Sequence, residues 1–320
     1  AEGKMLEMCQ VYGVIVISAL PLLMSQFLFQ SFFVTAEKPG LGLTMSILSG
    51  VTNIVLDFLF IVVFKWSLVG AALATAIGQV VGGVAPLIYF GRDNSSLLRL
   101  TKTKFDWDAL LKSCTNGLSE FLSNISMSVV GLIYNAQLMK YAGPDGVAAY
   151  GVLMYLNFIF ISIIIGYSVG TAPIIGYHYG AKNSNELKNI LKKSFIIIII
   201  TSVTMLLLGE ALAYPLSVIY VSYDQNLFDM TVNGFIIFSF GFLFSGFSIF
   251  GSSFFTALNN GLVSAVISTS RTAVFQVVTV FVLPLIFGIN GIWLSMVVAE
   301  FLAAIVSIVY IIINKKKYQY

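Results

Sequence analysis

Long apolar stretches recur along the chain, and they constrain its fold more than any other feature. Short polar segments or segments with Gly and Pro separate them. A helix that crosses a bilayer needs about 20 mainly apolar residues, and each stretch is long enough. Runs such as 195–200 lack the two-residue alternation of a membrane β-barrel strand. We therefore expect an all-α integral membrane protein with nine transmembrane helices, at 9–36, 43–64, 68–90, 108–139, 147–174, 189–220, 230–257, 262–286 and 290–313.

The composition excludes several other classes of protein. Hydrophobic residues make up 58% of the chain and charged residues 10%, whereas soluble domains are about 25% charged. Cys9 and Cys114 lie far apart in apolar stretches and predict neither a disulfide framework nor a metal cluster. His178 is the single histidine, and the sequence has no paired-aspartate motif and no Ser-His dyad. We therefore expect no enzyme, no cofactor and, at a net charge of +3, no nucleic-acid partner.

The longest polar interruption is basic and divides the chain. We expect residues 1–91 to hold three helices of one lobe, 92–107 to form a basic linker, 108–314 to form a six-helix lobe and 315–320 to form a basic tail. Loops rich in Lys and Arg stay in the cytoplasm. The linker, the lysines between 182 and 193 and the tail then all fall on one side. This pattern predicts a bacterial plasma membrane protein with a cytoplasmic C-terminus.

A shift of 221 residues superposes the first three spans on the last three. Glycines coincide at both ends of hairpins, where 13 meets 234, 40 meets 261 and 70 meets 291. Six spans separate the copies, so both have the same orientation, as in the parallel repeats of transporters. Spans four to six have no earlier counterpart, and the sequence begins with Ala1. We therefore expect part of a twelve-helix, two-lobe protein whose first three helices are absent here.

Three polar residues within the first spans form a candidate cation or proton site. Asn53 and Asp57 are four residues apart and share one helix face. Thr75 follows the turn near Trp66 by as many residues as Asp57 precedes it, so we expect similar depths on neighbouring helices. A carboxylate, an amide oxygen and a hydroxyl suit a proton or a hard cation such as Na⁺. The equivalent positions of the second copy are Val274, Val278 and Met296. Because the fold forms there without polar side chains, we favour a functional role over a role in helix packing.

Other ionisable residues lie within the later spans, where they are costly and are functional candidates. Arg271 and Glu300 lie near mid-depth on adjacent helices and could pair, either to fix the helix register or to gate. Glu120 lies near the middle of its span with Asn116 and Asn124 around it. This hydrated neighbourhood predicts a substrate or proton site.

The sequence resembles the multidrug and toxic compound extrusion (MATE) family of secondary transporters. The residues that carry the resemblance are Asn53-Ile-Val-Leu-Asp57, Gly70-Ala-Ala-Leu-Ala-Thr75, Pro173-Ile-Ile-Gly-Tyr-His-Tyr-Gly-Ala-Lys182 and Gly291-Ile-Trp-Leu-Ser295. The resemblance implies a monomer that exports small organic cations in exchange for Na⁺ or H⁺. It also implies that the three residues of the candidate site bind the coupling ion with an aspartate from the first helix, for which this sequence has no position.

Two alternatives stay open at this point. A flippase for lipid-linked precursors belongs to the same superfamily, but a pyrophosphate group would favour several bases within spans, and Arg271 is the one base away from the span ends. A receptor or scaffold that does not transport is the alternative from another class. It would not explain why the polar triplet occurs in one copy of the repeat and not in the other.

Overall fold

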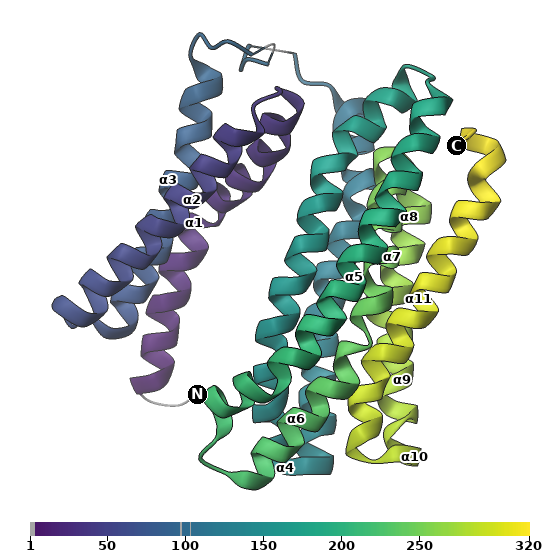
Figure 1. Ribbon diagram of the computed structural model, residues 1–320. Coiled ribbons are helices and arrows are strands. Elements are labelled where there is room, and N and C mark those ends of the chain that lie inside the picture. Colours follow the sequence, from purple (N-terminus) through teal and green to yellow (C-terminus); the bar gives the residue numbers. More distant parts are fainter. Residues whose placement is uncertain (1–3, 97, 103) are drawn as a thin grey trace. The chain divides into compact units, whose positions relative to one another are not determined.

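The computed structural model describes residues 4–96, 98–102 and 104–320, and every regular element in these ranges is a helix (Figure 1). The chain divides into two compact units, Ala1–Phe105 and Asp106–Tyr320. The division falls within the segment 92–107 that we expect to be a linker. Each unit is described by itself below.

Unit 1 is a bundle of three long helices. It consists of α1 (Lys4–Thr35), α2 (Pro39–Asp57), which continues as the π-helix η1 (Phe58–Val63), and α3 (Ser67–Gly91). Both α1 and α2 pack on α3. Glycines on α3 allow the close approach: Gly78 lies against Asn53, and Gly83 lies against the backbone of Leu22. Small residues of this kind are typical of helix contacts in membranes, where packing drives association.

Unit 2 begins with the long element α4 (Trp107–Gly180). As one straight helix it would measure about 110 Å, several times the thickness of a bilayer. Gly143 interrupts it with φ 65° and ψ −155°, a conformation that is open essentially to glycine alone. The rings of Tyr134 and Tyr150 stack with centroids 5.6 Å apart. The chain therefore turns back at Gly143, and α4 is a hairpin of two helical segments.

The rest of unit 2 packs around this hairpin (Figure 1). Its elements are α5 (Ser184–Val221), α6 (Gln225–Ser239), α7 (Phe242–Ala257), α8 (Gly261–Thr269), the π-helix η2 (Ser270–Phe275), α9 (Gln276–Val282), α10 (Pro284–Phe287) and α11 (Ile289–Tyr318).

Seven helices of the described chain are long and apolar enough to cross a membrane, and an eighth span results if the pair α6 and α7 is counted as one. That pair is bent by 50° where we expect an unbroken span over 230–257. The predicted number of nine is reached when the two segments of α4 count separately. The nine-helix count therefore stays a prediction.

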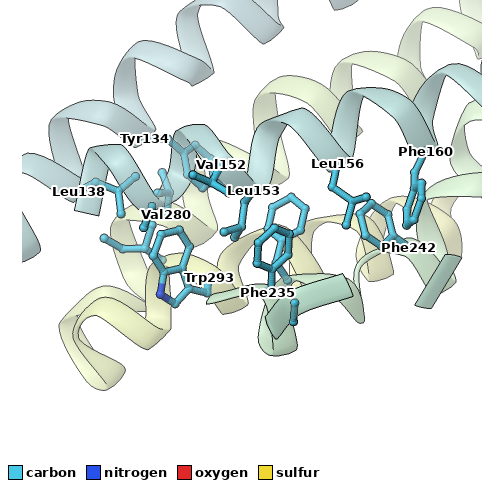
Figure 2. Close-up of a cluster of buried hydrophobic side chains, with 14 of the residues drawn as sticks. Tyr134, Leu138, Val152, Leu153, Leu156, Phe160, Phe235, Phe242, Val280 and Trp293 are labelled. Atoms are coloured by element: carbon cyan, nitrogen blue, oxygen red, sulfur yellow. The ribbon is translucent and has the colours of Figure 1, made fainter. Parts of the chain in front are cut away.

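A core of buried apolar and aromatic side chains holds unit 2 together. Figure 2 shows Leu153 of α4 beside Phe235 of α6 and Trp293 of α11, with Phe160 and Phe242 further along the same interface. Trp293 is 1% exposed although it is the largest of these side chains. Because lipid tails are as apolar as this core, close packing rather than removal from water stabilises it.

The expected tail 315–320 differs from the structure. Helix α11 continues to Tyr318, and the side chains of Tyr318 and Tyr320 are buried in a second cluster with Phe254 and Phe255. The hydroxyl of Tyr320 donates to the carbonyl oxygen of Ile311 at 2.9 Å. The lysine run suggested a solvated tail, but the two tyrosines supply aromatic surface that packs back on the helix ends.

Candidate cation site and buried ion pair

The structure brings Asn53 and Thr75 together inside unit 1. The Nδ2 atom of Asn53 on α2 donates to the Oγ1 atom of Thr75 on α3 at 3.5 Å. Gly78, one turn along α3 from Thr75, leaves room for the Asn53 side chain. Both side chains are half-buried. The residue spacing predicts Asp57 level with Thr75, whereas this hydrogen bond joins Thr75 to Asn53, one turn earlier on α2.

Asp57 lies one turn beyond Asn53, where α2 passes into the π-helix η1. Its Oδ1 atom is buried and has no hydrogen-bond partner among the described residues. A buried carboxylate oxygen without a partner is costly, and a proton or a bound cation removes the cost. Short π-helical segments often mark functional sites. The geometry of Asp57 therefore suits reversible binding of a proton or a cation.

The donor set of this site is one carboxylate with neutral oxygens. Within the described parts of the chain, His, Cys, Asp and Glu side chains form no group of three or more that could hold a metal ion. A transition-metal centre would need several such ligands. One carboxylate with neutral oxygens is a donor set that suits a proton or a hard cation.

In unit 2 the structure pairs Arg271 with Glu300. The Nε atom of Arg271 lies 2.9 Å from both carboxylate oxygens of Glu300. The Arg271 side chain is 12% exposed and that of Glu300 is 1% exposed. The hydroxyl of Ser248 on α7 donates to Glu300 Oε2 at 3.3 Å. Arg271 belongs to the π-helix η2, so both π-helical segments in the described part of the chain lie at a charged residue of a span.

The three residues of the predicted substrate or proton site do not converge on one point. Asn116 donates to the carbonyl oxygen of Thr256 at 3.4 Å, and Asn124 donates to the carbonyl oxygen of Glu120 within its own helix at 2.7 Å. The Glu120 side chain is exposed on unit 2.

Comparisons with known proteins agree with this architecture. The profile of the MatE family matches residues 121–282, half of the chain. This chain belongs to the MATE family. Two relatives named multidrug export protein MepA support the assignment. The one from Staphylococcus saprophyticus is 27% identical over 98% of this chain and 69% of its own length. The one from Staphylococcus haemolyticus is 28% identical over 98% of this chain and 70% of its own length.

Solved MATE structures share the fold. A crystal structure of MATE in complex with MaL6 covers the whole of this chain and 72% of its own, with a TM-score of 0.94 at 20% identity. The outward-facing conformation of a multidrug resistance MATE transporter has a TM-score of 0.93 at the same identity and coverage. This MATE chain is therefore an all-helical, multi-pass membrane protein, and it spans about 70% of the length of these relatives.

Sequence reasoning missed several polar residues inside unit 1 of this MATE chain. Gln79 lies four residues after Thr75 on the same face of α3, and its Oε1 atom is buried without a hydrogen-bond partner among the described residues. The hydroxyl of Ser49 donates to the carbonyl oxygen of Gly78 at 2.7 Å and contacts Gln26 Oε1 at 3.5 Å. The four-residue spacing from Thr75 was the signal that could have revealed Gln79.

Proposed function

We propose that this chain works in a secondary multidrug efflux transporter that exports small organic cations in exchange for Na⁺ or H⁺. Asp57 carries the coupling ion, and Asn53 and Thr75 supply neutral oxygens beside it. The observation that carries the proposal is the buried, unpartnered Oδ1 atom of Asp57 next to the Asn53–Thr75 contact, in a chain of the MATE family. Membership of a transporter family favours transport over catalysis.

The proposal includes an arrangement in the membrane. The chain contributes nine spans to a twelve-helix, two-lobe protein, with the two segments of α4 counted separately. It lies in the bacterial plasma membrane as a monomer with a cytoplasmic C-terminus. The basic residues on one side of the spans support this orientation, and the staphylococcal relatives support the bacterial membrane. Lobes that rock about a central cleft would give alternating access.

Asp57 serves exchange because its two states differ in charge. With a cation bound or with the carboxyl protonated, the site is neutral and tolerates burial. After release, the bare carboxylate is costly in low dielectric. Release of the ion and binding of an organic cation are therefore linked through one carboxylate. Glu120 of unit 2 offers a second acidic group that attracts an organic cation, since its side chain is exposed.

The alternative of a flippase for lipid-linked precursors is less well supported. A pyrophosphate group would need unpaired basic residues along a cleft. Arg271 is the base that lies away from the span ends, and its charge is balanced by Glu300 at 2.9 Å.

Proteoliposomes with the full-length protein test the proposal. We expect Asp57→Asn to abolish organic-cation efflux driven by either a Na⁺ or a pH gradient, while thermal stability in detergent stays near that of the wild type. Asp93→Asn is the matched control, because it removes an exposed carboxylate of unit 1 that pairs with Arg99 on the surface. Full coupled efflux by the Asp57→Asn protein would show that the site is structural.

A further inference from the structure

The interior of unit 1 carries neutral polar side chains beyond the candidate site. Starting from the Asn53–Thr75 contact, Ser49 follows one turn earlier on α2 and contacts Gln26 of α1. One turn further, Gln30 of α1 donates to the hydroxyl of Ser46 at 2.6 Å. Polar side chains thus lie in register on α1, α2 and α3, along a line that leads from Asp57 toward the turn between α1 and α2.

Gln79 lies on this line, and its side-chain oxygen lacks a hydrogen-bond partner among the described residues. It is one helical turn, about 6 Å, beyond Thr75 in the direction away from Asp57. It lies between Gly78, which accepts the Ser49 hydroxyl, and Gly82, which lies against the Gln26 side chain. Its Oε1 atom is buried and accepts no hydrogen bond from the described residues. An amide oxygen in this state lacks a positive partner.

The repeat shows what supplies such a partner in the other unit. Under the 221-residue shift, Gln79 corresponds to Glu300 and Gly50 corresponds to Arg271. In unit 2 the charge of Arg271 satisfies the oxygens of Glu300. In unit 1 the Gly50 position has no side chain, and nothing lies within 4 Å of where a Cβ would be. Unit 1 therefore has a side-chain oxygen at the position of Glu300, on Gln79, but no basic side chain at the position of Arg271.

The chemistry of these side chains selects the ion. Amide and hydroxyl oxygens are ligands for hard metal cations, but they take up no proton near neutral pH. A site with three neutral oxygens binds such a cation weakly, because no charge on the protein balances it. Weak binding suits a position that an ion passes through, whereas the charged Asp57 suits a position where it is held.

We propose that Gln79, Gln26 and Ser49 form a second Na⁺ position in unit 1, through which the coupling ion passes between Asp57 and the end of the bundle at Lys38. This inference rests on the proposed function and favours Na⁺ over H⁺. The pocket on this line, which Gln26, Gln30 and Gly82 help to line, is too narrow for a water molecule in this structure. Passage therefore requires α1 and α2 to separate and the ion to lose its hydration shell.

Na⁺ binding and Na⁺-driven efflux, measured separately, test this second position in the full-length protein. We expect Gln79→Leu to bind ²²Na⁺ at equilibrium within twofold of the wild type, because Asp57 is intact, and to lower Na⁺-driven turnover at least tenfold. Gln79→Glu adds a carboxylate at the position of Glu300, and we expect it to bind a second Na⁺ ion per protein. Gln225→Leu, an exposed glutamine of unit 2, is the control and should match the wild type.

The outcomes separate this inference from the proposed function. Wild-type turnover of the Gln79→Leu protein overturns the second position. Loss of equilibrium Na⁺ binding in that variant also overturns it, because Gln79 would then be a ligand of the Asp57 site. Efflux driven by a pH gradient alone overturns it too, while the proposed function stands. If Gln79→Leu does not fold, unchanged Na⁺ stoichiometry in Gln79→Glu decides against it. Coupled efflux by Asp57→Asn overturns the proposed function instead.

Discussion

The side chain of Arg271 binds both carboxylate oxygens of Glu300 through its Nε atom alone, at 2.9 Å each. The contact joins η2 to α11, which belong to consecutive spans of unit 2. Ser248 on α7 adds a third element. Since Glu300 is 1% exposed, its charge depends on this partner. The pair therefore fixes how three helices of unit 2 meet.

The first prediction is that removal of either Arg271 or Glu300 alone lowers the stability of the protein. Arg271→Leu leaves a buried carboxylate without its counter-charge, and Glu300→Leu leaves a buried guanidinium. We expect each single variant to lose about 3–5 kcal/mol of stability. The double variant should lose less than either, because no charge is stranded. Unfolding in lipid or detergent gives the double-mutant cycle, and a coupling energy near zero would show that the pair does not stabilise the unit.

The second prediction concerns the two neutral residues of the candidate cation site. Thr75→Ala removes one neutral oxygen, and we expect Na⁺ affinity to fall by about tenfold, the size of a lost contact of about 1.4 kcal/mol. Asn53→Val copies Val274 of the other repeat. We expect it to fold normally and to transport poorly, because a valine fits the apolar surroundings but binds no ion.

Equilibrium Na⁺ binding and Na⁺-driven efflux by the same preparations check this prediction. Thr52→Ala is a matched control for Thr75→Ala, because Thr52 bonds to the carbonyl oxygen of Leu48 within its own helix and is outside the site. Na⁺ affinities of Thr75→Ala and Thr52→Ala that agree within twofold would remove Thr75 from the site.

Most of the helical architecture followed from hydropathy, because each crossing needs about 20 apolar residues and leaves a long run in the sequence. The break between α6 and α7 did not follow, since Phe240 and Gly241 interrupt no apolar run. The burial of Tyr320 did not follow either, because three lysines precede it and a charge run does not reveal which aromatic rings fold back.

The candidate site shows a similar limit. The hairpin spacing placed Asp57 level with Thr75, whereas the hydrogen bond joins Thr75 to Asn53, one turn earlier on α2. Counting residues from a turn therefore does not fix the register of two packed helices to within one turn. Gln79 was missed because an uncharged side chain within a span gives a weak signal. Its importance depends on whether its oxygen has a partner, and that depends on Gly50, where the neighbouring helix offers none.

The third prediction concerns the contact between α1 and α3. A Cβ at Gly83 would meet the backbone carbonyl of Leu22, which cannot rotate away. We expect Gly83→Ala to destabilise unit 1 by about 1–3 kcal/mol, as overpacking does. Gly166→Ala is the control, because a Cβ there meets nothing within 4 Å and alanine favours a helix by up to about 1 kcal/mol. Equal melting temperatures of the Gly83→Ala and Gly166→Ala proteins in detergent would contradict the close approach of α1 and α3 at Gly83.

The last prediction concerns the turn in α4. Gly143 has φ 65° and ψ −155°, and a Cβ there meets no other atom within 4 Å. Space is therefore not the constraint, and backbone conformation is. An alanine would be strained by about 1–3 kcal/mol, and it would favour an unbroken helix across the turn.

We expect Gly143→Ala to lower the melting temperature in detergent and to loosen the stacking of Tyr134 on Tyr150, which depends on the two segments of α4 lying side by side. Cysteines in place of Tyr134 and Tyr150 report the proximity of the two segments, because cross-linking between them should fall in the Gly143→Ala background. Gly131→Ala, in the middle of the first segment with nothing within 4 Å of its Cβ, should leave cross-linking unchanged. Equal cross-linking and stability in both backgrounds would mean that the reversal does not need glycine at 143.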